Sequence, residues 1–372
     1  MAGVPSKIDT WQMVSPTTYK KDENGKFVVD APGKLERTTI PVPELGAGDA
    51  LVEVAGCGVC HTDLSYFYDG VPTVSKPPLT LGHEISGTVV AGPSALVGKN
   101  VIVPAVMPCN DCAICAEGRG NRCLAQKMPG NSLGAYGGFA SHIPVPAADL
   151  CPVENRNLPL EYLAVVADAI STPYQAAVRA DLQPGDLVVV IGGTGGVGTY
   201  VTQVAAAFGA RAVVAADLNA EKLARITEFG DTHTINTAGL SAKEVKEAFK
   251  DYCKQAGLPS NYGWKIFEVT GTRAGQEIAL DLLPFVGKLI VIGYGMQKVE
   301  FMFSRLMALD AEIIGTWGCL PKYYPSVLQL VLDGKIKLEP FVETRPMSRI
   351  GEVFEQAHSG RLSRRVVLTP DF

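Results

Sequence analysis

The stretch VVVIGGTGGVGTYVTQVA, residues 188–205, decides the fold class of this chain. It begins as a run of apolar β-branched residues, which is typical of a strand buried on both faces, and it passes directly into a glycine-rich turn and a helical pattern. Such glycines permit a tight turn, leave the backbone open to a pyrophosphate and let the helix pack closely, with its N-terminus facing the anion. A glycine-rich turn without a ligand is the alternative. The predicted cofactor-binding residues of the turn are Gly193, Gly195, Gly196, Val197 and Gly198.

The next apolar run, ARAVVAAD (residues 210–217), ends in Asp217. An acid about 20 residues after such a turn accepts hydrogen bonds from the adenine ribose hydroxyls of a dinucleotide and repels a 2′-phosphate. Leu218 and Asn219 follow, rather than an arginine that could pair with that phosphate. We therefore expect NAD rather than NADP, and we include Lys222 among the cofactor-binding candidates.

The segments on either side of this motif differ in the pattern of their apolar residues and in their predicted secondary structure. From residue 173 onward, apolar runs at 186–193, 210–217, 264–271 and 288–295 alternate with helical patterns such as 199–209 and 219–230, which predicts a parallel α/β sheet. Residues 35–150 hold short β-rich runs broken by Gly and Pro, at 50–59, 84–92, 100–106 and 138–146. After about residue 315, a helix at 323–335 and a strand at 364–370 could close back onto that β-rich part.

The predicted fold class is therefore α/β plus β, with two domains. We expect a β-rich catalytic domain over residues 1–172 and 314–372, and a doubly wound parallel-sheet cofactor domain over residues 173–313. A length of 372 residues suits two domains that each bury a full core.

Composition excludes several classes of function. A net charge of −5 argues against nucleic acid as the main partner, because phosphate binding needs a clustered basic surface. The N-terminal segment lacks the apolar core of a signal peptide, and no run of about 18 apolar residues occurs, so we expect a cytoplasmic protein without a membrane partner. Nine cysteines in such a chain indicate metal or redox chemistry more than disulfides.

Four of the cysteines lie within one short segment, MPCNDCAICAEGRGNRC (residues 107–123). Cys109, Cys112, Cys115 and Cys123 are spaced C-x2-C-x2-C-x7-C, so four thiolates can reach one tetrahedral zinc and leave no position open for a substrate. This predicts a structural zinc site. An iron–sulfur cluster uses similar spacings and is the alternative.

A second group is dispersed. GCGVCHTD contains Cys60 and Thr62, and LGHEISG contains His83 and Glu84. Taken singly, a cysteine or histidine here could be a satisfied core residue. Together with a nucleotide fold and a second zinc site, they form a plausible ligand set that lacks one member.

The missing member can come from EYLAVVADAISTPYQAA (residues 161–177), where Asp168 has apolar or small neighbours on both sides. If this stretch is one helix, Asp168 faces away from the apolar stripe, near Glu161, and is an ordinary solvated acid. A catalytic zinc needs three protein ligands and one open position, and a buried acid without a partner is costly. Cys60, His83 and Asp168 would neutralise Zn²⁺, with Glu84 or Glu161 as competitors for the third position.

These motifs together resemble the zinc-containing medium-chain alcohol dehydrogenase family, over nearly the whole chain. The resemblance implies a GroES-like catalytic domain, a Rossmann cofactor domain, NAD, and two zinc ions per chain. It implies that Cys60 and His83 bind the catalytic zinc, that Thr62 accepts the hydroxyl proton, and that Arg365 in SRRVVL meets the cofactor pyrophosphate.

The chain departs from the family pattern at two positions. The family's third ligand is a cysteine in a CAxxT segment, and this sequence reads DAIST there, so Asp168 takes its place. A carboxylate is a harder ligand than a thiolate, and the exchange is chemically sound. Ser65 stands where many members carry a histidine for proton relay. Glu84 is expected to tune the metal rather than to bind it permanently.

Six further segments resemble those members of the family that oxidise the ring hydroxyl of 6-hydroxycyclohex-1-ene-1-carbonyl-CoA with NAD⁺, in anaerobic benzoyl-CoA breakdown. They are residues 8–14, 60–87, 101–109, 127–131, 137–142 and 317–325. This implies an acyl-CoA substrate and a homo-oligomer, dimer or tetramer. The alternatives are another alcohol or polyol dehydrogenase of the same fold, and a non-catalytic NAD-sensing or crystallin-like protein.

Overall fold

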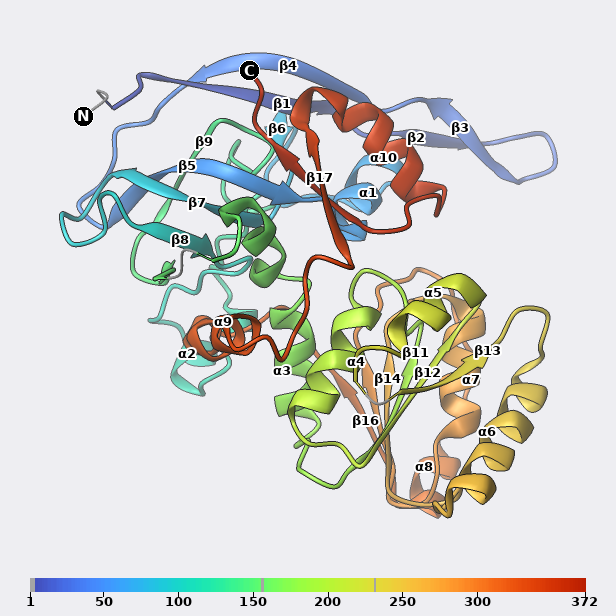
Figure 1. Ribbon diagram of the computed structural model, residues 1–372. Coiled ribbons are helices and arrows are strands. Elements are labelled where there is room, and N and C mark those ends of the chain that lie inside the picture. The colour runs from blue at the N-terminus through green and yellow to red at the C-terminus, as the bar shows by residue number, and fades with distance from the viewer. Residues whose placement is uncertain (1–3, 155–156, 231) are drawn as a thin grey trace. The chain divides into compact units, whose positions relative to one another are not determined.

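The structure is a computed structural model that describes residues 4–154, 157–230 and 232–372, and it divides into two compact units (Figure 1). Unit 1 comprises Met1–Ala169, Gly318–Leu328 and Leu338–Phe372, and unit 2 comprises Ile170–Trp317 and Gln329–Lys337. The predicted boundary at 172/173 lies close to the division after Ala169, and the one at 313/314 lies close to that after Trp317. Residues 329–337, which we expected in the catalytic domain, cluster with unit 2.

Unit 2 has a parallel sheet. Among its described residues, six strands lie in the order β13-β12-β11-β14-β15-β16, and every neighbouring pair is parallel. Their bounds are β11 Leu187–Ile191, β12 Ala212–Asp217, β13 Thr232–Asn236, β14 Trp264–Glu268, β15 Lys288–Val291 and β16 Glu312–Gly315. The chain proceeds in one direction from β11 through β13 and in the other from β14 through β16. This is the doubly wound arrangement, and it confirms the predicted fold class of the cofactor domain.

Both faces of this sheet are buried, as the uninterrupted apolar run of β11 requires. All five residues of β11 are buried. Val189 and Ile191 join a core with α6 and α7, whereas α4 lies on the opposite face (Figure 1). Within the described residues, the helices of both units are α1 His61–Tyr68, α2 Ala113–Ala116, α3 Ser171–Arg179, α4 Gly198–Ala207, α5 Ala220–Ile226, α6 Ala242–Ala256, α7 Arg273–Leu282, α8 Ser304–Leu309, α9 Tyr324–Leu332 and α10 Ile350–His358.

Short 3₁₀ segments complete the helical part. They are η1 Gly120–Arg122, η2 Leu160–Ala167, η3 Pro321–Tyr323 and η4 Met347–Arg349. In the part of the chain that the structure describes, none of the helices has both the length and the apolar character needed to span a bilayer.

Unit 1 is β-rich, as predicted. Its largest sheet, within the described residues, has the order β10-β8-β7-β5-β18-β17, with β9 also paired to β5. The bounds are β5 Asp49–Gly58, β7 Glu84–Ala91, β8 Asn100–Val103, β9 His142–Pro146, β10 Cys151–Pro152, β17 Val342–Pro346 and β18 Arg365–Thr369. A second sheet has the order β4-β1-β6, and β2 pairs with β3. These strands are β1 Lys7–Ser15, β2 Thr18–Lys21, β3 Phe27–Ala31, β4 Lys34–Pro41 and β6 Leu79–Thr80.

Three strands of unit 1 meet at one place, where β5 ends, β7 begins and β18 pairs with both the end of β5 and the residue after it. Gly58, the last residue of β5, pairs with Glu84, the first residue of β7, and also with Val367 of β18. The backbone N–H of Val59 then donates to the carbonyl of Val366 at 2.9 Å. The chain leaves β5 directly into Cys60, so residues from three distant parts of the sequence meet beside that cysteine.

The glycine-rich turn of unit 2 provides a matched pair of stability variants. A Cβ at Gly198 would lie 1.9 Å from the carbonyl oxygen of Gly192, whereas a Cβ at Gly195 would meet only that same oxygen, at 3.5 Å. We expect Gly198→Ala to lower the free energy of unfolding by ~2 kcal/mol or more, because backbone must move. Gly195→Ala should stay within about 0.5 kcal/mol of the parent chain. Chemical denaturation monitored by circular dichroism measures both, and equal stabilities of the two variants would contradict the close packing of this turn.

Candidate active site

Asp168 ends a 3₁₀ segment rather than lying on a helix face. Residues Leu160–Ala167 form η2, Asp168 leaves the helical conformation with φ −142° and ψ −54°, and α3 begins only at Ser171. The interpretation of residues 161–177 as one helix with a solvated acid is therefore wrong. Helical periodicity in the sequence does not reveal this interruption of the helical conformation, because the apolar residues of η2 are buried whichever side of the segment they lie on. The Asp168 side chain is only 16% exposed.

Asp168 faces the two predicted ligands in unit 1. Its Oδ2 lies 3.7 Å from Sγ of Cys60 and 3.6 Å from Nε2 of His83. Ligand atoms at about 2.0–2.3 Å from a tetrahedral zinc are roughly 3.3–3.8 Å apart, so these separations suit one ion. Glu84 belongs to the same group, whose ligand atoms all lie within 4.8 Å of one another. Glu161, the other competitor for the third position, does not belong to it.

Asp63 holds two of these ligands in place. It is the third residue of α1, and Cys60 caps that helix. The Asp63 carboxylate accepts the backbone N–H of Cys60 at 3.1 Å and that of Gly82 at 3.0 Å, and its Oδ1 lies 3.2 Å from Nδ1 of His83. A histidine whose second nitrogen meets a carboxylate presents the first to a metal in a defined orientation. We assigned no role to Asp63 from the sequence, although an acid three residues after a helix cap is a recognisable signal.

The electrostatics of the group favour a cation. Burial opposes a charge on His83, but the Asp63 carboxylate and the Cys60 thiol together raise the pKa of this imidazole well above its usual value. Burial also raises the pKa of Glu84, against the influence of Arg365. Buried acids so close together destabilise one another unless a positive charge lies among them. Zn²⁺ fits both the donor set and this requirement.

Glu84 is held by an arginine. Nε of Arg365 donates to Oε2 of Glu84 at 2.8 Å, and the Arg365 NH2 group donates to Oε1 of the same carboxylate. Both side chains are almost fully buried. A Cβ on Gly58 would lie 2.0 Å from Glu84 Oε2, so only glycine fits beside this pair. The arrangement supports the expectation that Glu84 acts beside the metal, and it shows that Arg365 has a partner within unit 1.

Thr62 and Ser65 occupy different positions on α1. Oγ1 of Thr62 lies 3.7 Å from Sγ of Cys60, beside the ligand group. Ser65 is buried, and its carbonyl accepts the backbone N–H of Asp69. The Thr62 hydroxyl therefore lies beside a predicted metal ligand, as a role in proton transfer requires.

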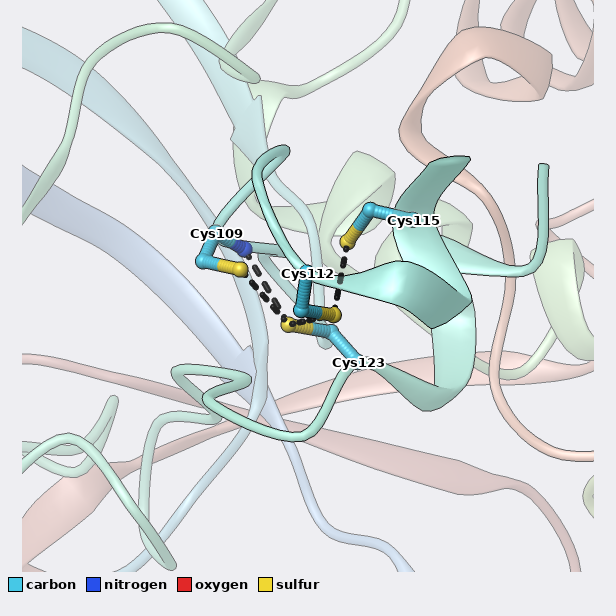
Figure 2. A group of neighbouring side chains, drawn as sticks. All are labelled: Cys109, Cys112, Cys115 and Cys123. Carbon is cyan, nitrogen blue, oxygen red and sulfur yellow. Dashed lines mark hydrogen bonds between the residues drawn. The ribbon is translucent and has the colours of Figure 1, made fainter. Parts of the chain in front are cut away.

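The four closely spaced cysteines converge in a separate lobe. Figure 2 shows their sulfur atoms pointing toward one another from the start of α2 and the loops on either side of it and of η1. The Sγ separations are 3.3 Å for Cys109 and Cys123, 3.5 Å for Cys112 and Cys115, and 3.7 Å for Cys112 and Cys123. Backbone N–H groups of Leu124 and Cys115 lower the pKa of Cys112 to about 6, which favours the thiolate that metals bind.

These separations distinguish the two metals considered for the lobe. Sulfurs about 2.3 Å from a single tetrahedral zinc are ~3.8 Å apart. An iron–sulfur cluster places several atoms between its thiolates and would hold them farther apart. All four ligand atoms lie within 4.8 Å of one another, so the lobe fits one zinc ion without an open position.

The predicted cofactor residues of unit 2 lie around the end of β12 and the start of α4. Asp217, the last residue of β12, accepts the backbone N–H of Thr194 at 2.9 Å and that of Leu218 at 2.7 Å. Its carboxylate is thereby fixed beside the glycine-rich turn, at the carboxyl edge of the sheet where such folds bind ligands. Lys222 lies in the first turn of α5, and its backbone N–H donates to the side-chain oxygen of Asn219.

Comparisons with known proteins agree with this geometry. Residues 46–155 match the model of the alcohol dehydrogenase GroES-like domain, and residues 196–333 match that of zinc-binding dehydrogenases. An alcohol dehydrogenase of Geobacillus stearothermophilus is 30% identical over 352 residues, covering 90% of this chain and 95% of that protein. A sorbitol dehydrogenase of Bacillus subtilis is 30% identical over 317 residues, covering 83% and 86% of the two chains.

A solved structure extends the likeness to the fold. Acetophenone reductase from Geotrichum candidum, determined in complex with NAD, superposes with a TM-score of 0.82 at 26% identity, over 99% of this chain and 98% of the other. The β-rich unit, the doubly wound sheet and the two ligand groups thus occur in one chain that resembles such dehydrogenases over nearly its full length. This chain belongs to the zinc-containing medium-chain alcohol dehydrogenase family.

Proposed function

We propose that this chain oxidises a secondary alcohol to a ketone with NAD⁺, using zinc held by Cys60, His83 and Asp168. The observation that carries the proposal is the approach of Asp168 Oδ2 to both the thiol and the imidazole, at 3.7 and 3.6 Å. A thiolate and a carboxylate supply the two negative charges that balance Zn²⁺, and a set of three protein ligands leaves one position for substrate. A protein that only senses NAD has no need for these residues together.

The side chains divide the work of the reaction. When bound, zinc would lower the pKa of a substrate hydroxyl toward neutrality and NAD⁺ would supply the hydride acceptor. Thr62, whose hydroxyl lies beside Cys60, would accept the proton of the substrate hydroxyl and pass its own hydroxyl proton on to solvent. Asp63 keeps His83 and Cys60 in position, and Arg365 keeps the Glu84 carboxylate from competing freely for the metal.

NAD is the proposed cofactor because of Asp217. Its carboxylate is held beside the glycine-rich turn by two backbone N–H groups, and it would accept hydrogen bonds from ribose hydroxyls but repel a phosphate there. This argument depends on one negative charge at the end of β12.

Two broader features accompany the proposal. None of the nine cysteines, all of which lie in the described residues, forms a disulfide, which suits a reducing, cytoplasmic compartment.

Met302, Phe303 and Met307 are more than two-thirds exposed at or next to α8. Exposed apolar patches of this kind mark association surfaces, which supports a homo-oligomer.

A narrower substrate is a second candidate. The six segments that resemble dehydrogenases of 6-hydroxycyclohex-1-ene-1-carbonyl-CoA support a cyclic hydroxyacyl-CoA. Two of those segments supply metal ligands, since residues 60–87 contain Cys60 and His83 together with Asp63, and residues 101–109 contain Cys109. The relatives described above are named for alcohols and polyols, and they favour the broader alternative of another secondary alcohol or a polyol.

The metal proposal predicts the effect of Asp168→Asn. This change keeps the size of the side chain and removes one of the two charges that balance zinc, so zinc affinity of the catalytic site should fall by at least ~10–100-fold. We expect one zinc per chain instead of two, preserved folding and NAD binding, and activity close to absent. Glu161→Gln is the matched control, because Glu161 lies outside the ligand group, and it should retain two zincs. A fully active Asp168→Asn protein with two zincs would remove Asp168 from the site.

The cofactor proposal predicts the effect of Asp217→Asn. The amide oxygen can still accept the N–H of Thr194, but the charge that repels a 2′-phosphate is lost. The ratio of kcat/KM for NAD⁺ to that for NADP⁺ should therefore fall roughly tenfold or more. Glu221→Gln removes an acid whose side chain is 85% exposed on α5 and should leave the ratio unchanged. Equal use of both cofactors by the parent protein would refute the role of Asp217.

The narrower substrate proposal predicts a preference among alcohols. The CoA thioester of 6-hydroxycyclohex-1-ene-1-carboxylate should have a kcat/KM at least ~100-fold above that of cyclohex-2-en-1-ol or sorbitol, because binding of the remote acyl-CoA part can be used in the transition state. NADH formation at 340 nm measures all three. Turnover of sorbitol or the simple alcohol as efficient as that of the thioester would favour the broader alternative.

A further inference from the structure

Tyr324 is a buried phenol that joins two segments of unit 1 beside the predicted metal ligands. It is the first residue of α9, and its side chain is fully buried. Its hydroxyl accepts the backbone N–H of Ala105 at 3.1 Å and donates to the carbonyl of Ala167 at 2.6 Å. These partners precede Tyr324 in the sequence by 219 and 157 residues. The reaction described above gives Tyr324 no role.

The chemistry of the three groups fixes the direction of both hydrogen bonds. An amide N–H can only donate and a carbonyl can only accept, whereas a phenol does both. The Tyr324 oxygen therefore accepts from Ala105, and its own proton points at Ala167. Both alanines are buried, so removal of the hydroxyl would take one partner from a buried N–H and one from a buried carbonyl.

The carbonyl of Ala167 belongs to the peptide unit that carries Asp168. This unit is planar, so the direction of the carbonyl also sets the direction of the Asp168 N–H and the position of its Cα. Ala167 is the last residue of η2, where carbonyls lack donors from the helix itself. Asp168 has φ −142° and ψ −54°, which is neither helical nor extended, so regular secondary structure does not define where its side chain points. The hydrogen bond at the Ala167 carbonyl contributes that definition.

The other partner of the phenol, Ala105, follows a strand that runs beside a second predicted ligand. β8 pairs with β7 in antiparallel fashion, and Val103 lies opposite Ile85. This register leads toward Ala105 on one chain segment and toward His83 on the other, because each is two residues beyond the pair. The phenol therefore connects the peptide unit before the third ligand to the part of the sheet that carries His83.

The position of this peptide unit matters because the ligand atoms are already at the separations that zinc requires. Oδ2 of Asp168 lies 3.7 Å from Sγ of Cys60 and 3.6 Å from Nε2 of His83. A metal site functions when its ligands are held within roughly 0.5 Å of the required geometry. A displacement of the Asp168 backbone by more than this would weaken one of the three metal–ligand bonds.

We propose that Tyr324 is the positioning residue of the third zinc ligand, because its hydroxyl fixes the Ala167 carbonyl and thereby aims the Asp168 carboxylate at the other two ligands. This rests on the proposed role of Asp168 as a zinc ligand. Tyr324 acts through Asp168 and not through a contact of its own with metal or substrate. Its loss therefore weakens zinc binding at the catalytic site and leaves the site of the four cysteines unchanged.

Three variants and a matched control test this role. Tyr324→Phe deletes the hydroxyl and keeps the ring, whereas replacement of Tyr324 by para-aminophenylalanine keeps a donor toward Ala167. Asp168→Asn, alone and combined with Tyr324→Phe, tests whether the effect passes through the carboxylate. Ser86→Ala is the matched control, because the buried Ser86 hydroxyl donates to the carbonyl of Leu160, at the other end of η2, also at 2.6 Å.

The measurement is the dissociation constant of Zn²⁺ at the catalytic site, titrated against a competing chelator, together with the metal content of each protein. We expect Tyr324→Phe to raise this constant about ten- to a hundredfold, as the loss of groups that orient metal ligands does. Ser86→Ala and the para-aminophenylalanine protein should stay within about threefold of the parent protein. In the Asp168→Asn background, Tyr324→Phe should add less than about twofold, because it then has no ligand to position.

Several outcomes overturn the inference. If Asp168→Asn weakens zinc binding and Tyr324→Phe does not, Asp168 is a ligand that Tyr324 does not position. Equal losses for Tyr324→Phe and Ser86→Ala, or additive losses in the double variant, would show that Tyr324 only supports the fold. Thermal unfolding of all variants in saturating zinc separates lost stability from lost affinity.

Two further results remain informative. If Tyr324→Phe does not fold, the para-aminophenylalanine protein decides, since a tenfold or greater loss of zinc affinity in a folded protein that keeps the donor would contradict the inference. If Asp168→Asn itself binds zinc as the parent protein does, the proposed function fails, and the inference fails with it.

Discussion

The Asp63 carboxylate, buried between α1 and the start of β7, is the interaction on which the metal site depends. It accepts backbone N–H groups from Cys60 and Gly82 and faces the imidazole of His83. These contacts join the end of β5, the first turn of α1 and the turn before β7, next to the pairing of Gly58 with Glu84. A single buried charge thus sets the position of one ligand's backbone and the orientation of another's ring.

The charge of the site follows from this arrangement. In the proposed site, the thiolate of Cys60 and the carboxylate of Asp168 would balance a divalent ion, and the Glu84–Arg365 pair is close to neutral as a unit. A family member with cysteine at the third position would have the same charge at the metal. The exchange to aspartate in this chain therefore alters the hardness of the ligand set rather than its charge. The second lobe, with four thiolates and no open position, is independent of this chemistry.

Short sequence motifs were sufficient to predict the cofactor domain and the structural zinc site. The apolar run of β11, the glycine turn and Asp217 are close in sequence, and the four cysteines of the zinc lobe span one short segment, so spacing alone was informative. Features that depend on contacts between residues far apart in the sequence could not be predicted from the sequence alone. The pairing of Glu84 with Arg365 joins residues 281 positions apart. The end of the helical conformation at Asp168 depends on the packing of η2 against β5 and β7 rather than on the periodicity of its own sequence.

The central claim is that a carboxylate, a thiolate and an imidazole hold one zinc while four thiolates hold another. Zinc K-edge X-ray absorption on the purified protein, combined with metal analysis, counts the sulfur ligands directly. Four sulfurs in the lobe and one from Cys60, shared by two zinc ions, give an average of about 2.5 sulfurs per zinc. An average near four with one zinc per chain would show that only the lobe binds metal. An average near three with two zincs would show that a second thiolate, and not Asp168, completes the catalytic site.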